Sequence, residues 1–373
     1  MRVGVPREIK NHEYRVGLIP SSAKEIVQAG HDVLIEAGAG IGSEIADAEY
    51  RAVGAKILSD AAAVFGEADL IVKVKEPQAQ ERKLLRKGQT LFTFLHLAPD
   101  VEQTDDLIRS GSTCIAYETV TSATGGLPLL APMSEIAGRL APQVGASALQ
   151  KSNGGAGILL GGVPGVAPAR VVILGAGVAG THAAMISLGM GADVTVLDRS
   201  NDVLKRISMQ FGGAVRTVFS TATAIEQHVS HADLVIGTVL VPGAESPKLV
   251  SRKMLSQMKP RSVIVDVAID QGGCCETSRP TTHAEPTYVI DGIVHYCVAN
   301  MPGAVARTST FALNNATLPF IMEIANKGWR RACEDDDRLL DGLTVHAGAL
   351  ANAAIARAQA KAATPARRLV QDA

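Results

Sequence analysis

The stretch RVVILGAGVAGTHAAMISLGMGADVTVLDRS, residues 170–200, combines an apolar run, three closely spaced glycines, a helical pattern and a second apolar run. The glycines are Gly175, Gly177 and Gly180, in the spacing G-x-G-x-x-G. Between a strand and a helix, the first glycine permits a tight turn, the second lets the backbone approach a pyrophosphate, and the third lets the helix lie close to the strand. The N-terminus of that helix attracts negative charge. The stretch therefore predicts a Rossmann unit that binds a dinucleotide, and a glycine-rich turn without a ligand is the weaker interpretation.

Asp198 indicates which dinucleotide the unit favours. It ends the run VTVLD at the distance expected for an acceptor of the ribose 2′-hydroxyl, where a carboxylate repels a 2′-phosphate. We therefore expect NAD, although the neighbouring Arg199 leaves NADP open. A second glycine-rich segment, EAGAGIGS at 36–43, has Ser43 where a third glycine is needed, and we expect a loop there.

The rest of the chain repeats the alternation of strands and helices. From residue 170 six short apolar runs alternate with helical patterns, and residues 1 to about 130 do the same. A small-residue amphipathic pattern after Ser134 predicts a linking helix, and the helical segment after residue 304 is expected to pack back on the first domain without strands of its own. The fold class is therefore α/β, with two doubly wound, Rossmann-like parallel sheets. We expect residues 1–133 plus 305–373 to form a substrate domain and residues 134–304 to form the NAD-binding domain.

Composition excludes several classes of protein. The 373 residues are 47% hydrophobic, which is enough for two cores, and 36 basic against 37 acidic side chains give no excess charge for nucleic acid or a membrane surface. The five cysteines contain no C-x-x-C pair, so neither a disulfide framework nor a zinc site is indicated. The start of the chain lacks a signal-peptide pattern, and no run of about 20 residues is apolar enough to span a bilayer. We expect a soluble, cytoplasmic protein.

The run LFTFLHLAPD, residues 91–100, predicts a strand of large apolar residues that ends at His96. Ligands of open α/β sheets bind beyond the carboxyl ends of the strands, so a polar residue there is a stronger candidate for a functional role than one elsewhere. A lone histidine at a strand end more often completes a hydrogen bond in the core. This run alone does not decide whether His96 has a structural role or transfers protons.

Other charged residues stand near predicted strand ends. ADLIVKVKEP, residues 68–77, places Lys73 and Lys75 on one strand face, where a solvated edge would explain one of them. Arg15 precedes an apolar run and could hold a carboxylate by a two-pronged contact, although alone it is typical of a surface arginine. Asp270 ends the run VIVDVAID, whereas Asp266 inside it could hold a loop. Together these residues suit hydride chemistry on a small anionic substrate.

Over residues 1–346 the chain resembles the alanine dehydrogenases. The resemblance lies in motifs that follow one another at the family's spacing: VGVPREIKNHEYRVGLIP, VKVKEP, LFTFLHLA, AYETV, LPLLAPMSEIAGR, LLGGVPGV, LGAGVAG, DLVIGTVLVPGA, VDVAIDQGGC, SRPTTH and YCVANMPGAVARTST. It implies reversible NAD-linked oxidative deamination of L-alanine to pyruvate and ammonium, with a homohexamer as the usual assembly.

The resemblance also assigns roles to four residues. Arg15 would bind the substrate carboxylate, and Lys75 would polarise the developing oxyanion. His96 would be the acid/base that takes a proton from the attacking water or the carbinolamine hydroxyl. Asp270, the catalytic aspartate, would steady the amine.

Cofactor contacts carried over from the family extend the glycine motif. The full set is Ser134, Gly175, Gly177, Val178, Gly180, Asp198, Ser220, Val239, Leu240, Val267, Ala268, Ile269, Asp270, Arg279, Val298, Ala299, Asn300 and Met301. Two departures stand out. Val203 replaces a basic residue found near the adenosine in many relatives, which predicts weaker affinity on the adenine side. Lys327 stands where some relatives use a histidine, with a glutamate equivalent to Glu323, to hold magnesium, so we expect no metal.

Two other functions are weighed against this enzyme. A nucleotide-binding subunit of a proton-translocating transhydrogenase has the same two-domain plan but need not keep Arg15, Lys75, His96 and Asp270 together. A cofactor-sensing binding module would bind NADH without turnover. The presence of all four polar residues favours the enzyme.

Overall fold

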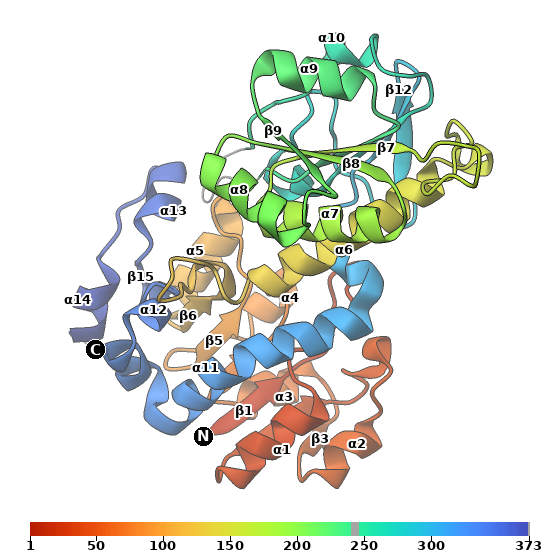
Figure 1. The fold of residues 1–373 in the computed structure, drawn as a ribbon. Coiled ribbons are helices and arrows are strands. Elements are labelled where there is room, and N and C mark those ends of the chain that lie inside the picture. The colour runs from red at the N-terminus through yellow and green to blue at the C-terminus, as the bar shows by residue number, and fades with distance from the viewer. Residues whose placement is uncertain (240–245, 372–373) are drawn as a thin grey trace. The chain divides into compact units, whose positions relative to one another are not determined.

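The computed structural model describes residues 1–239 and 246–371, which divide into two compact units. The first contains Met1–Met133 and the chain from Val305 onward, and the second contains Ser134–Ala304. In Figure 1 the first unit takes the red, orange and blue ends of the colour scale, and the second the yellow-green to cyan middle. Both are α/β units, so the predicted fold class is confirmed. Every described helix is too short or too polar to cross a membrane.

The first unit is built on an eight-stranded sheet with the order β15-β14-β6-β5-β4-β1-β2-β3. Strands β1 to β6 are parallel, and the order in which the chain adds them reverses between β1 and β4. Ligands of doubly wound sheets bind beyond the carboxyl ends of the strands at such a switch point. The strands are β1 Arg2–Val5, β2 Asp32–Glu36, β3 Lys56–Leu58, β4 Leu70–Val72, β5 Thr90–Thr93, β6 Thr113–Ala116, β14 Leu343–His346 and β15 Ala349–Leu350.

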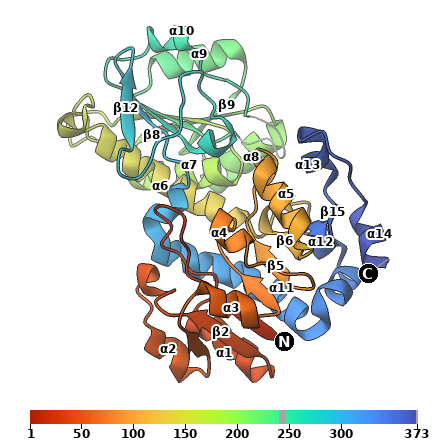
Figure 2. The ribbon, with the colours of Figure 1, turned by 180° about the vertical axis from the view of Figure 1, so that it is seen from behind.

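Helices of the first unit cover this sheet with apolar side chains. Residues of α3, α5 and α13 share one core with the strands, and α1 packs against α11, as Figure 2 shows from behind. Helix α11 is the longest and is interrupted at Gly328, whose φ of 76° and ψ of 153° are not helical. The helices are α1 Pro20–Gln28, α2 Asp47–Ala52, α3 Ala61–Glu67, α4 Ala79–Arg82, α5 Val101–Ser110, α11 Ala306–Asp335, α12 Asp337–Leu340, α13 Ala353–Ala358 and α14 Ala366–Gln371.

Two details of the first unit differ from the prediction. The C-terminal segment does pack on the first domain, but it also adds β14, antiparallel to β6, and β15 to the sheet. These two strands lie among helices α11 to α14, so no alternation of strands and helices marks them as part of the sheet. The strand predicted to end at His96 is also wrong, because β5 ends at Thr93. The segment EAGAGIGS forms a turn that ends in a short 3-10 helix, η1, Ile41–Ser43.

The second unit is built on a seven-stranded sheet with the order β12-β13-β11-β10-β7-β8-β9. Six parallel strands reproduce the predicted doubly wound sheet, with the switch point between β7 and β10. The seventh, β12, was not predicted; it joins β13 through a hairpin at Asp291 and Gly292, both with positive φ, and such an Asp-Gly pair is a hairpin signal. The strands are β7 Arg170–Leu174, β8 Asp193–Asp198, β9 Arg216–Phe219, β10 Leu234–Gly237, β11 Val263–Asp266, β12 Thr287–Ile290 and β13 Ile293–Tyr296.

The helices of the second unit include the linking helix and the helix after the glycine turn. The linking helix is α6, Ala131–Ala148, within which the boundary between the two units falls. Residues of α9 and α10 share a core with β7, β8, β10 and β11. The remaining helices are α7 Val178–Gly189, α8 Asn201–Gln210, α9 Ala222–Ser230, α10 Arg252–Leu255, and the 3-10 helices η3 Lys151–Asn153, η4 Val267–Gln271 and η5 Met301–Val305.

Candidate active site

The glycine turn between β7 and α7 has the geometry that its spacing predicts. Gly175 has φ of 95°, and a Cβ atom there would lie 2.8 Å from a methyl carbon of Val239. A Cβ atom on Gly180 would lie 1.9 Å from the carbonyl oxygen of Gly175. These two glycines are thus required by the turn itself and by the close approach of α7 to β7.

Gly177 differs from the other two because the protein does not crowd it. It precedes the first residue of α7, Val178, and a Cβ atom on it would meet no protein atom within 4 Å. Its φ of −67° is accessible to any residue. The fold therefore does not need glycine here, whereas a phosphate approaching the helix N-terminus would.

The Asp198 carboxylate is hydrogen-bonded to a backbone amide of this turn. Its Oδ2 accepts a hydrogen bond from the amide of Ala176 at 2.8 Å, and its Oδ1 accepts one from the amide of Ser200 at 2.9 Å. The carboxylate ends β8, is half-buried, and lies next to the glycine turn. This is the placement expected for a group that recognises a ribose.

Ser220 and Val239 also follow the ends of strands near the switch point. Ser220 donates its amide to the carbonyl oxygen of Asp198 at 2.9 Å, which places it directly after β9 beside the end of β8. Val239 follows β10 and contacts the Gly175 turn. Leu240 lies outside the described residues.

Asp266 and Asp270 have different environments. Asp266 is buried and accepts hydrogen bonds from the amides of Ala268, Cys274 and Cys275 and from the Ser278 hydroxyl, so it holds the loop around η4. Burial raises the pKa of the Asp266 carboxyl. Asp270 lies on η4 and is exposed. The loop is thus fixed by one acid while the other remains accessible.

The remaining cofactor candidates lie on several elements of the second unit. Arg279 donates its amide to the Tyr288 hydroxyl at 2.8 Å, and its guanidinium lies 4.4 Å from the centre of the Tyr288 ring. Asn300 has φ of 60°, an uncommon conformation for a residue other than glycine. The other candidates are Ser134 on α6, Val267, Ala268 and Ile269 on η4, and Val298, Ala299 and Met301 after β13.

In the first unit, Arg15 is buried and paired with an acid that the sequence analysis did not single out. Its Nε donates to Oε1 of Glu13 at 2.7 Å and its Nη2 donates to Oε2 at 2.6 Å, while Nη1 contacts the sulfur of Met133 at 3.0 Å. Arg15 is only 2% exposed, so it is not a surface arginine.

The two lysines after β4 are both buried. Lys73 donates to Glu8 at 3.1 Å and to Glu81 at 2.7 Å and is fully buried, so the solvated edge considered for it is wrong. Burial raises the pKa of Glu8, and the Lys73 ammonium opposes this effect. The Glu8 Oε1 also accepts the amides of Val74 at 2.7 Å and Lys75 at 3.3 Å. Glu8 therefore fixes the backbone that carries Lys75.

His96 lies in the loop beyond β5 and is exposed. Its φ is 49°, and its amide donates to Oε1 of Glu118 at 2.6 Å. The Glu118 carboxylate also accepts the amide of Leu95, with both oxygens at 3.2 Å. The His96 ring stacks on Phe94, with 5.7 Å between ring centres and 5° between the planes.

Arg15, Lys75 and His96 belong to segments that follow β1, β4 and β5, three neighbouring strands of one sheet. A Cβ atom on Gly17 would lie 2.6 Å from the carbonyl oxygen of Val72, so the segment after Arg15 contacts the end of β4. The Thr93 hydroxyl donates to the carbonyl oxygen of Lys75 at 2.9 Å, which joins the ends of β4 and β5. The segments carrying the three predicted residues therefore converge at the switch point of the first unit, whereas Asp270 belongs to the second unit.

Three acids were missed by the sequence analysis, namely Glu8, Glu13 and Glu118. Each accepts a hydrogen bond from the side chain or the backbone amide of a predicted site residue. Glu118 could have been found, because it follows β6, the neighbour of β5, by two residues. Glu8 and Glu13 lie in the long segment after β1, where the sequence gives no spacing that pairs an acid with a cation.

The residues that would hold magnesium in some relatives do not fit a metal ion in this chain. The Lys327 ammonium lies 2.6 Å from Glu323 and 3.2 Å from Asp335, so a cationic side chain pairs with these acids where a metal would need a neutral ligand. Among residues 1–239 and 246–371, no three His, Cys, Asp or Glu side chains gather in a way that could hold a metal.

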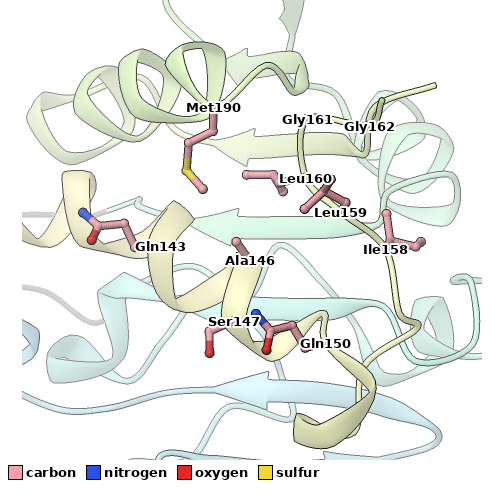
Figure 3. A pocket seen from close by; sticks show the side chains of 10 residues that line it. All are labelled: Gln143, Ala146, Ser147, Gln150, Ile158, Leu159, Leu160, Gly161, Gly162 and Met190. Carbon is pink, nitrogen blue, oxygen red and sulfur yellow. The ribbon is translucent and has the colours of Figure 1, made fainter. Parts of the chain in front are cut away.

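Figure 3 shows a hollow of about 530 Å³ in the second unit, between α6, the segment 158–162 and the end of α7. Its lining is largely apolar, with Leu159, Leu160 and Met190, and its polar members are Gln143, Ser147 and Gln150. None of the lining side chains is titratable near neutral pH. The hollow offers no acid/base chemistry and includes no predicted site residue.

The doubly wound sheets and the glycine turn define a nucleotide-binding α/β protein of two units. Two family models match: "Alanine dehydrogenase/PNT, N-terminal domain" over residues 4–137 and "Alanine dehydrogenase/PNT, C-terminal domain" over residues 141–353. The chain belongs to this alanine dehydrogenase/PNT family, which confirms the resemblance found in the sequence.

Individual relatives agree with this assignment. The chain is 61% identical to an alanine dehydrogenase of Halomonas elongata over 96% of each chain, and 55% identical to one of Mycobacterium tuberculosis over 95% of this chain and 96% of that one. A solved L-alanine dehydrogenase matches with a TM-score of 0.94 at 51% identity, over 96% of this chain and 99% of that one. A transhydrogenase from Sinorhizobium meliloti matches with a TM-score of 0.80 at 27% identity, over 95% of this chain and 100% of that one.

Proposed function

We propose that this chain catalyses the reversible NAD-linked oxidative deamination of L-alanine to pyruvate and ammonium. The observation that carries the proposal is the convergence of the segments bearing Arg15, Lys75 and His96 at the switch point of the first unit. The high identity to proteins named alanine dehydrogenase supports the choice of substrate. In this proposal residues 1–133 and 305–373 form the substrate domain, and residues 134–304 bind the cofactor.

The second unit fits NAD on two structural grounds. The open space at Gly177 leaves room for a pyrophosphate, and the Asp198 carboxylate beside the turn suits a ribose 2′-hydroxyl rather than a 2′-phosphate. NAD, when bound, supplies the acceptor for the hydride that leaves Cα of alanine. Ser220, Val239, Arg279 and residues 298–301 would complete its contacts.

Arg15 and Lys75 would hold the anionic end of the substrate. The Arg15 guanidinium is held in one orientation by Glu13 on Nε and Nη2 and by Met133 on Nη1, and in this orientation it would bind the alanine carboxylate. Lys75 is buried, which strengthens its attraction for a carbonyl oxygen that becomes negative during the reaction.

His96 would move the protons of the reaction. Loss of hydride from Cα leaves an iminium, and His96 would take a proton from the water that attacks its carbon. His96 would then give this proton to the amine nitrogen of the carbinolamine and take the hydroxyl proton as ammonia departs. Asp270, exposed on η4, would steady the departing amine.

The test is the appearance of NADH when the purified protein is mixed with NAD and L-alanine at alkaline pH. D-alanine, L-serine, L-lysine and a reaction without an amino acid serve as controls. We expect turnover with L-alanine and none with D-alanine. Absence of turnover across the panel, with NADH still bound, would overturn the proposal in favour of a sensor.

The transhydrogenase remains the competing function because a solved transhydrogenase shares the fold. Its lower identity, 27% against 51% for the L-alanine dehydrogenase structure, places it second. Hydride transfer from NADH to a thio-NADP analogue without any amino acid would favour it. We also propose that the protein is cytoplasmic and that it forms a homohexamer. Light scattering on the purified protein would test the hexamer.

A further inference from the structure

His96 occupies a conformation that few residues other than glycine adopt. Its φ of 49° lies in the left-handed region, where the Cβ atom crowds the backbone. Such a conformation persists only where the surroundings hold it, and non-glycine residues in it gather at functional sites. The cause of this turn must therefore lie in a neighbouring group.

The Glu118 carboxylate is that group. It accepts the amides of two consecutive residues, Leu95 and His96, and the bond to His96 is short at 2.6 Å. Two adjacent amides can point at one acceptor only if the backbone turns between them, and a charged acceptor makes such bonds about twice as strong as neutral ones. Glu118 lies on η2, Tyr117–Thr119, directly after β6, so the sheet fixes its position.

Aromatic contacts hold the ring once the backbone is set. The His96 ring lies parallel to Phe94, and Phe94 meets Tyr117 edge to face at 5.1 Å between ring centres. Tyr117 precedes Glu118 in the chain and is fully buried. One short segment, residues 117–118, thus supports both the backbone and the ring environment of His96.

We infer that Glu118 is a positioning residue for His96: its carboxylate clamps the amides of Leu95 and His96 and so directs the imidazole toward the substrate. This inference rests on the proposed function, in which His96 is the acid/base. Glu118 acts through His96 and does not itself touch the reacting atoms.

The first test is a double-mutant cycle in L-alanine oxidation. Glu118→Ala removes both acceptors and is expected to lower kcat about 100-fold, the cost of a reacting group misplaced by roughly 1 Å, with KM for NAD unchanged. Glu118→Gln keeps one carbonyl acceptor and should retain an intermediate rate. In a His96→Ala background, Glu118→Ala should change the remaining rate less than about twofold, because the group it positions is already absent.

The second test measures the protection of the backbone amides and does not depend on catalysis. Hydrogen–deuterium exchange of the peptide covering residues 90–97 should rise in Glu118→Ala and less in Glu118→Gln. Asp60→Ala is the matched control, because Asp60 is an acid that accepts the amide of Ala63 at the N-terminus of α3, away from this turn. It should leave both the exchange of residues 90–97 and kcat unchanged.

The two failures are distinguishable. A wild-type protein that does not oxidise L-alanine would overturn the proposed function, while increased exchange in Glu118→Ala would still support the clamp. Full activity of Glu118→Ala, or an additional loss of rate in the His96→Ala background, would overturn the inference. If Glu118→Ala does not fold, the intermediate kcat and exchange expected of Glu118→Gln carry the test, and wild-type values for both would overturn it.

Discussion

The carboxylate of Glu13 holds the guanidinium of Arg15 through two hydrogen bonds, Nε to Oε1 at 2.7 Å and Nη2 to Oε2 at 2.6 Å, with both side chains buried. A buried guanidinium without a partner would be costly, so the pair is a condition for placing a cation here. It also fixes the orientation of the Arg15 guanidinium. An acid two residues from the arginine thus determines how a carboxylate can bind.

Glu13→Gln is expected to raise KM for L-alanine about tenfold and to lower the free energy of unfolding by about 1.5–3 kcal/mol. The amide offers one acceptor in place of two, and the hydrogen bonds lost are to a charged group. Steady-state kinetics and urea unfolding measure both effects. Glu25→Gln, on the exposed face of α1, should change neither value, and an unaltered KM in Glu13→Gln would contradict a role for the pair in substrate binding.

Two glycine variants separate folding from cofactor binding. Gly177→Ala should fold with wild-type stability, because its Cβ meets no protein atom within 4 Å, but should bind NADH at least tenfold more weakly. Gly180→Ala places a Cβ 1.9 Å from the Gly175 carbonyl oxygen and should destabilise the second unit. Thermal unfolding and NADH fluorescence titration give the two readings. Wild-type NADH affinity in Gly177→Ala would argue against a pyrophosphate at this turn.

Asp198→Asn should reduce the preference for NAD over NADP. The neutral side chain no longer repels a 2′-phosphate, and Arg199 follows directly. We expect kcat/KM for NAD to fall about tenfold and the ratio of NAD to NADP use to fall further. Asp202→Asn, in the first turn of α8, removes a nearby charge without touching the glycine turn and serves as the control. An unchanged ratio of NAD to NADP use would show that Asp198 does not recognise the ribose 2′-hydroxyl.

Stability should depend on pH through Asp69. The hydrogen bond from the Arg2 guanidinium lowers the pKa of the Asp69 carboxyl below its usual value. A lowered pKa stabilises the folded chain above the unfolded-state pKa, about 3.9, and this contribution is lost as the pH falls through the lowered value. Because the pair is partly exposed, Asp69→Asn should cost only about 0.5–1 kcal/mol at pH 7. Urea unfolding should show this difference shrink below about pH 4, and a constant difference would assign it to another cause.

The sequence allows the architecture to be predicted well because its strongest signals are local. The glycine turn, Asp198 and the alternation of apolar runs are each read within about thirty residues, and the structure has the predicted parallel sheets. Strand ends were less certain: β5 ends at Thr93, and beyond Phe94 the amides of Leu95 and His96 donate to Glu118 and not to a neighbouring strand. That contact joins residues more than twenty positions apart, and no pattern near His96 reveals it.

The burial of charged side chains could not be predicted from the sequence either. Lys73 and Lys75 alternate as on an exposed edge, yet Lys73 is fully buried between Glu8 and Glu81. Pairing of this kind depends on which loops meet at the switch point. It follows from the sheet order β5-β4-β1, which a single sequence does not specify.

The most direct measurement of the central claim is a product balance. Purified protein is supplied with NAD and L-alanine, and NADH, pyruvate and ammonium are quantified in the same reaction. We predict equal amounts of all three, with their formation slowed about 10²–10⁴-fold in His96→Ala, the usual loss on removing a general acid/base, although that variant still binds NADH within a few-fold of wild type. NADH without matching pyruvate and ammonium, or no NADH at all from L-alanine, would contradict the assignment.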